Sequence, residues 1–147
     1  MVVEDKEIEK ICSFYISEYH LEMILLPFIN DKIENNKKVI IETEYNLEES
    51  LKRVLERTNL KQENKNKILS LGWNSKEKNK LEDKSNIIVI GNKEYIKNAN
   101  NEIIKNNLEN ITVVDCYKFE ELGNDVTKIE NSYACNLNTN GIKNINK

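Results

Sequence analysis

Four short apolar runs, separated by stretches with helical spacing, constrain the fold of this 147-residue chain more than any other feature. The runs begin near Ile11, Val39, Ile87 and Ile111. The second and third runs, Val39–Ile41 and Ile87–Ile90, contain no polar residue. Continuous runs of this length are typical of strands that are covered on both faces, as in parallel sheets.

Amphipathic stretches follow the apolar runs. Residues 20–35 carry one apolar stripe, and Ser17 is placed to cap the helix that this spacing predicts. Pro27 lies within the pattern, so we expect the helix to kink or restart there. Residues 46–49 form a capping-box pattern at the start of a second helix, and residues 93–109 predict a third.

Weaker signals lie between these helices and toward the C-terminus. Residues 60–73 predict a short helix that ends at Gly72 in a left-handed conformation. Residues 74–85 are charged and are expected to form an insert or a loop. A helix over residues 119–131 is expected next, followed by a hairpin within residues 133–147 that turns at an Asn-Gly pair.

The alternation of strands and helices predicts the fold class. It indicates βαβ units in one α/β domain over residues 1–147. We expect three layers, with a mostly parallel sheet of about four to six strands and helices on both of its faces. The connection between residues 44 and 86 is long enough to contain a further strand.

Composition excludes several classes of protein. The net charge of −3 argues against a protein that coats nucleic acid. No apolar run approaches the roughly 20 residues that a membrane-spanning helix needs. The N-terminal residues lack the pattern of a secretory signal, so we expect a cytoplasmic protein. The three cysteines, Cys12, Cys116 and Cys135, include no CxxC pair, which favours reduced thiols over disulfides or a zinc site.

Polar residues after the predicted strands are the candidates for a site, because ligands of parallel sheets bind beyond the carboxyl ends of the strands. The candidate ligand-binding residues are Tyr15, Ser17, Tyr19, His20, Glu42, Glu44, Asn92 and Asp115. The simpler interpretation is that they cap helices and fill loops. His20 is the only histidine, and at a helix start it could bind an anion or change its charge at about pH 6 to 7.

Several familiar sites are excluded by residues that the sequence lacks. It has four glycines but neither GxGxxG nor a Walker A motif, and thus no phosphate-binding loop. Gly91-Asn92 stands where a receiver domain would have its phosphoacceptor Asp, and no GxSxG nucleophile motif is present. A single histidine excludes a multi-histidine metal site within one chain. We therefore expect no cofactor, no metal and no catalytic site.

Two alternatives for individual residues stay open. An enzyme could use Cys116 or the pair Glu42 and Glu44, although the simpler interpretation of the cysteine is a small buried apolar residue. Lysines give residues 61–84 a local positive excess. This excess indicates either a solvated loop or a docking patch for an acidic partner.

Part of the N-terminal half matches a known pattern: a strand with Phe-Tyr, a helix with Pro-Phe, and a strand that leads into a capped helix. The matching segments are Phe14-Tyr15, His20-Leu21-Glu22, Leu26-Pro27-Phe28-Ile29 and Lys38-Val39-Ile40-Ile41, with a looser match from Asn46 to Leu55. This pattern resembles the MEDS sensory domain. The resemblance implies a RecA- or Rossmann-like sheet that has lost its phosphate-binding loop and senses small organic molecules in bacterial signalling. Members are often fused to DNA-binding domains or histidine kinases, and we expect no such output domain in this chain.

We expect, from the residues and the resemblance, a non-catalytic signalling or regulatory domain. It would bind a small organic ligand, or a signalling partner such as a histidine kinase or transcription regulator, at the carboxyl ends of the strands. The ligand would act by stabilising one arrangement of the loops there. The alternative is a protein-interaction module without a small ligand, for example a kinase antagonist or adaptor. Neither hypothesis involves nucleic acid or a membrane.

Overall fold

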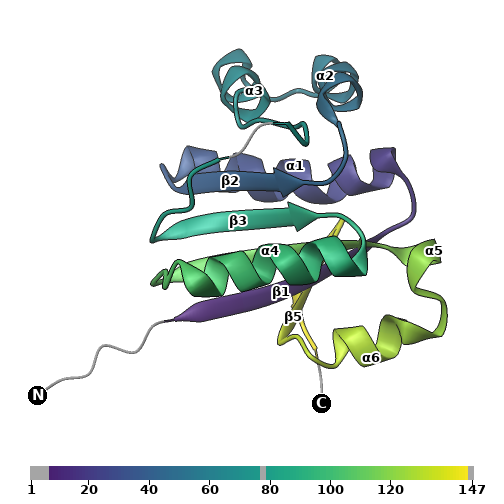
Figure 1. Ribbon diagram of the computed structural model, residues 1–147. Coiled ribbons are helices and arrows are strands. Elements are labelled where there is room, and N and C mark those ends of the chain that lie inside the picture. Colours follow the sequence, from purple (N-terminus) through teal and green to yellow (C-terminus); the bar gives the residue numbers. More distant parts are fainter. Residues whose placement is uncertain (1–6, 77–78, 146–147) are drawn as a thin grey trace, which may run out of the picture.

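A six-stranded sheet with helices on both faces forms the protein in the computed structural model, which describes residues 7–76 and 79–145 (Figure 1). The strands are β1 (Ile8–Tyr15), β2 (Lys38–Thr43), β3 (Ser85–Ile90), β4 (Ile111–Lys118), β5 (Cys135–Asn138) and β6 (Gly141–Asn144). Their order across the sheet is β2-β3-β4-β1-β5-β6, and β6 runs antiparallel to β5 while the other neighbours are parallel. The predicted three-layer α/β fold with a mostly parallel sheet is confirmed.

The helices divide between the two faces of the sheet. They are α1 (Glu18–Glu34), α2 (Glu48–Glu56), α3 (Gln62–Leu69), α4 (Lys93–Lys105), α5 (Phe119–Leu122) and α6 (Val126–Glu130), with a 3-10 turn, η1 (Gly123–Asp125). Helix α1 packs on one face together with α2 and α3, whereas α4, α5 and α6 pack on the other. No helix in the described part of the chain is long and apolar enough to cross a membrane.

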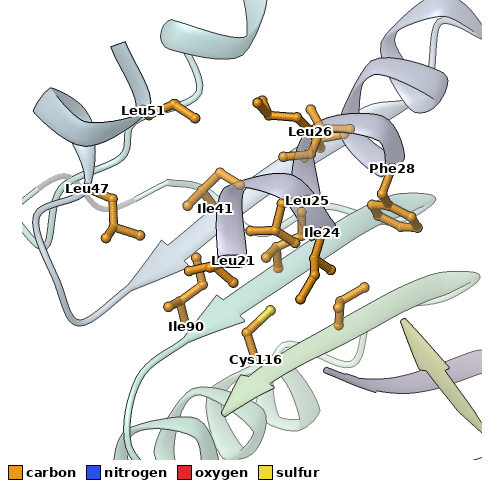
Figure 2. Packing of buried hydrophobic residues seen from close by; sticks show 14 of the residues in the cluster. Leu21, Ile24, Leu25, Leu26, Phe28, Ile41, Leu47, Leu51, Ile90 and Cys116 are labelled. Carbon is orange, nitrogen blue, oxygen red and sulfur yellow. The ribbon is translucent and has the colours of Figure 1, made fainter. Parts of the chain in front are cut away.

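Successive side chains along the strands point to opposite faces of the sheet and fill the core on each face. On β2, β3 and β4, the side chains of Ile41, Ile90 and Cys116 enter the core beneath α1, as Figure 2 shows. Their neighbours along the same strands, such as Ile40 and Val89, enter the core beneath α4. The central strands are therefore apolar on both faces, which is why their sequences read as continuous apolar runs.

Helix α1 follows its predicted stripe but does not restart at Pro27. The helix is continuous from Glu18 to Glu34, and Pro27 is exposed. Leu26 and Phe28, on either side of the proline, are both buried in the core. Packing on both sides holds the helix together despite the backbone hydrogen bond that proline cannot donate.

The start of α2 differs from the predicted capping box. Leu47 is the N-cap residue, and its side chain makes no capping hydrogen bond. Instead the backbone N–H of Glu48 donates to Oδ1 of Asn46, in a turn that precedes the helix. Leu47 is 3% exposed, so burial of this side chain in the core sets where the helix begins.

Helix ends were predicted too late in two places. Helix α3 ends at Leu69, although Gly72 does adopt the expected positive φ, of 85°. Helix α4 ends at Lys105 rather than residue 109, and Asn107 then has a φ of 54°. Asparagine tolerates the left-handed region better than most residues, so it can end a helix as glycine does.

The regions with weak sequence signals are partly as expected. The helix predicted over residues 119–131 is divided into α5, η1 and α6, and the C-terminal hairpin is confirmed as β5 and β6. No strand lies between β2 and β3 in the described residues, so the connection contains no further strand there. Within the 74–85 segment, whose residues 77 and 78 lie outside the described residues, Asn79 Nδ2 donates to the carbonyl of Ile41 at 2.9 Å.

Candidate functional site

Four of the candidate residues lie where β1 ends and α1 begins: Tyr15, Ser17, Tyr19 and His20. Ser17 Oγ accepts a hydrogen bond from the backbone N–H of His20 at 3.1 Å, and it is the N-cap of the helix. His20 Nδ1 in turn accepts from the N–H of Ile16 at 2.9 Å. Tyr19 is exposed, and Tyr15 is buried beneath the loop. Ser17 and His20 thus hold the helix start in place.

Glu44 and Asn92 join the loops that follow the second and third strands. One carboxylate oxygen of Glu44 accepts from the backbone N–H of Asn92 at 2.9 Å, and the other accepts from the side-chain amide at 3.3 Å. Asn92 Oδ1 accepts from the N–H of Tyr95 at 2.7 Å and so caps α4. The structure therefore brings these two predicted residues together.

The hollows described at the strand ends are small. One of about 120 Å³ lies beside Tyr15, and one of about 70 Å³ lies beside Asn92. Sites for small molecules usually measure about 300 to 1,000 Å³. Burial raises the pKa of the Tyr15 hydroxyl above its usual range, so this side chain stays neutral. The edge is therefore a set of loops held by their own hydrogen bonds, with little enclosed space.

Glu42 and Asp115 do not join this group. Glu42 lies on β2, beside a hollow of about 380 Å³ that is also lined by residues of α4, Tyr95 among them. Asp115 lies in the middle of β4, opposite Cys12 of β1 and Val89 of β3. From the sequence we expect Asp115 at a strand end, but it lies within β4, which continues to Lys118.

Asp115 is fully buried and accepts hydrogen bonds from three side chains. Lys10 Nζ lies 2.6 Å from Oδ2 and forms an ion pair with it. Tyr133 OH donates to the same oxygen at 2.5 Å, and Asn100 Nδ2 donates to Oδ1 at 3.0 Å. Lys10 also donates to Asn100, which closes the network. The partners come from β1, from α4 and from the segment before β5, so the carboxylate ties three parts of the chain together.

Two tyrosines extend this network toward the strand ends. The hydroxyl of Tyr133 lies 2.7 Å from that of Tyr117 on β4, and the two rings are in an edge-to-face arrangement. Burial raises the pKa of Tyr117 to about 12, and burial together with the charge of Asp115 raises that of Tyr133 further. Both hydroxyls therefore stay protonated and act as hydrogen-bond donors.

A groove of about 430 Å³ opens above the Asp115 network, between β1 and α4; we call it the α4 groove. Its floor contains Lys10, Asp115, Tyr117 and Tyr133. Asn100, which binds Asp115, belongs to the floor as well. The apolar walls are Ile8, Ile96, Ile103, Ile104 and Val113, and the polar rim is Lys93, Lys97 and Asn101. The volume falls within the range of small-molecule sites, unlike the hollows at the strand ends.

Cys12 and Cys116 offer no accessible thiolate, whereas Cys135 on β5 is partly exposed. Cys12 and Cys116 lie on the neighbouring strands β1 and β4, and both are fully buried. Burial raises the pKa of Cys12 to about 12 and that of Cys116 well above its usual value. Thiols in such surroundings are poor nucleophiles. Among the described residues, no group of three or more His, Cys, Asp or Glu side chains could hold a metal ion.

Three residues of the groove were missed by the sequence analysis: Lys10, Asn100 and Tyr133. Lys10 precedes the apolar run at Ile11, and the run begins too late to include it in the strand. Its position two residues before the buried Cys12 was the available signal, because such positions share a face of the strand. For Asn100 and Tyr133, nothing in the local sequence indicates contact with Asp115.

Comparisons with known proteins leave the chain without a family assignment. No protein-family model matches it, and searches of curated proteins and of solved structures find no match either. The similarity to the MEDS domain therefore rests on the residue pattern alone.

Proposed function

We propose that this protein is a non-catalytic binding domain of bacterial signalling, and that its small-molecule ligand lies in the α4 groove. The observation that carries the proposal is the Asp115 network on the groove floor. The carboxylate of Asp115 is fully buried, and burial of a charge costs free energy. Its partners come from three distant segments, and together they hold it in one geometry. Such fixed polar groups beneath apolar walls are what a small-molecule site needs for orientation and specificity.

The chemistry of the groove supports binding rather than catalysis. Both oxygens of Asp115 already accept hydrogen bonds, and its nearest cation, Lys10, is bound to it. A general base or a nucleophile must come within reach of the substrate, and Asp115 has no exposed surface. The carboxylate is therefore placed to hold Lys10 and Tyr133 in position.

The tyrosine pair supplies a route from the groove to the strand ends. Tyr133 contacts Asp115 on the groove floor, and Tyr117 also lines the small hollow beside Asn92 and Lys118. A ligand that contacts Tyr133 would favour one arrangement of this pair, and through it one arrangement of the loops at the strand ends. In this proposal the residues predicted for the site, such as His20 and Asn92, form the surface that a signalling partner contacts.

The alternative, a protein-interaction module that uses the lysines of residues 61–84, has less support. Lys61 lies 3.6 Å from Glu34, and Lys67 lies 3.3 Å from Glu63. Part of the positive charge of this stretch is thus neutralised locally, although exposed pairs of this kind are weak.

The test is a thermal-shift screen of the full chain with a library of small metabolites, repeated with two exposed isoleucines changed. Ile104→Trp fills the groove from its wall without adding a charge, and Ile142→Trp on β6 is the matched control. We expect compounds that stabilise the protein to lose at least tenfold in affinity in the first variant and to be unaffected in the second. Compounds that still bind Ile104→Trp but lose affinity in His20→Ala would place the site at the strand ends and contradict the proposal.

A further inference from the structure

The charges around the α4 groove do not balance, and the imbalance bears on the chemistry of the ligand. Three lysines and one aspartate line the groove: Lys10, Lys93, Lys97 and Asp115. Lys10 pairs with Asp115, and Lys93 pairs with Asp125 at 2.9 Å. Lys97 forms no ion pair with any residue in the described part of the chain. Within the residues that the structure describes, the charge of Lys97 is therefore uncompensated at the rim.

The floor of the groove has donor capacity to spare. A lysine ammonium has three N–H donors, and the two hydrogen bonds of Lys10, to Asp115 and Asn100, use two of them. The side chain of Lys10 is 33% exposed, so part of it reaches solvent at the floor of the groove. The oxygens of Asp115 already accept three hydrogen bonds. An incoming polar group is thus met by N–H donors and by positive charge.

The walls of the groove favour a ligand that has an apolar part. Ile104 is 67% exposed and Ile8 is 47% exposed, and both line the groove. Contact with an aliphatic group would remove this apolar surface from water, which favours binding. The volume of about 430 Å³ accommodates one small molecule.

We infer that the ligand of the α4 groove is a small aliphatic monocarboxylate, whose anionic group is held by Lys97 and Lys10 and whose chain lies against Ile8 and Ile104. This inference rests on the proposed function of the groove. A cationic ligand would meet like charges at the rim, and a neutral one would leave the charge of Lys97 unused. A ligand with several negative charges would exceed the one uncompensated cation that the groove offers.

The experiment compares three probes of equal chain length in titrations of the isotope-labelled full chain, followed by amide NMR shifts. The probes are hexanoate, hexanamide and hexylamine. We expect hexanoate to shift the amides of Lys97, Asn101 and Ile104, and to bind at least tenfold more tightly than hexanamide. Hexylamine is expected to bind least, because it carries the same charge as the lysines.

A pair of lysine variants tests where the selectivity comes from. Lys97→Gln should weaken hexanoate binding about fivefold and leave hexanamide binding unchanged. Lys105→Gln, which changes an exposed lysine at the end of the same helix, should leave both unchanged. An unaltered hexanoate affinity in Lys97→Gln would overturn the inference.

The outcomes separate this inference from the function on which it rests. If hexanamide or hexylamine binds in the groove as tightly as hexanoate, the anionic ligand is wrong and the groove remains a ligand site. If none of the three probes shifts a groove amide, the inference is overturned, and the metabolite screen with the Ile104 and His20 variants decides the proposed function separately.

Discussion

The face of the sheet under α1 and the face under α4 are packed in different ways. Under α1, buried aliphatic side chains from α1, α2, α3 and the strands make one continuous core (Figure 2). Under α4, the apolar layer is interrupted by Asp115 and the side chains that bind it. The first face is held mainly by dispersion and the hydrophobic effect, whereas the second contains a buried ion pair, whose burial is costly.

This difference indicates a division of roles within one small domain. An apolar core tolerates many hydrophobic side chains, provided that their volume fits. A buried ion pair with its hydrogen bonds accepts few replacements, because each lost partner leaves a polar group unsatisfied. We therefore expect the α1 face to provide stability and the α4 face to carry the specificity of the groove.

The largest expected effect is that of Lys10→Met, which leaves the fully buried Asp115 without its cation. We expect a loss of about 3 to 5 kcal/mol in the free energy of unfolding, measured by urea denaturation. The double variant Lys10→Met with Asp115→Asn removes the charge as well and should recover a large part of the loss. A loss below about 1 kcal/mol in the single variant would mean that Asp115 is not buried as a charge.

A comparable but slightly smaller effect is expected under α1. Leu25 is 1% exposed, and Leu25→Ala should cost about 2 to 5 kcal/mol, since it removes buried methyl groups and leaves a cavity. This loss should be the same at pH 5 and at pH 8, because no charge is involved. The half-buried Met23 on the same helix provides the control, and Met23→Ala should cost clearly less. A loss that varied with pH would break the contrast between the two faces.

The smallest expected effect concerns Glu22, a buried carboxyl group on α1. One of its oxygens accepts from Ser50 Oγ at 2.6 Å, and the other has no hydrogen-bond partner in the described part of the chain. Burial raises the pKa of Glu22 above its ordinary value of 4.5, although the bond from Ser50 opposes the shift. The folded protein therefore binds this proton more tightly than the unfolded chain does.

The sign of the pH dependence follows from this difference. The contribution of the protonated Glu22 is fully present below pH 4.5, and it is lost as the pH rises through the raised pKa of the folded state. Glu22→Gln removes this dependence and should raise the stability at pH 7 by roughly 1 kcal/mol, as read from urea denaturation at several pH values. Identical pH profiles for the two proteins would show that Glu22 does not titrate in a shifted range.

The fold could be predicted from the sequence because its signals are local. The apolar runs at Val39–Ile41 and Ile87–Ile90 lie on β2 and β3, and the stripe from Leu21 to Ile33 lies on α1. Hydrophobic periodicity is a property of neighbouring residues, and so it can be read from the chain alone. Helix ends were less well predicted, since burial of Leu47 and the left-handed Asn107 depend on the surroundings of each helix end.

The candidate site was predicted only in part. Glu44 and Asn92 do meet at the strand ends, as expected from the parallel sheet. Asp115 was expected beside them, but it lies inside β4 and contacts Lys10, Asn100 and Tyr133 instead. Local sequence does not show which distant side chains a buried polar residue contacts.

By itself, the sequence determined the order of strands and helices and the parallel sheet that they form, since both follow from the spacing of apolar residues along the chain. Only the tertiary structure decided where the polar groups meet. Lys10, Asn100, Asp115 and Tyr133 lie on four different segments of the chain, and they come together when β4 pairs with β1 and α4 packs over them. The energy of a buried charge depends on such distant partners, and no local pattern encodes them.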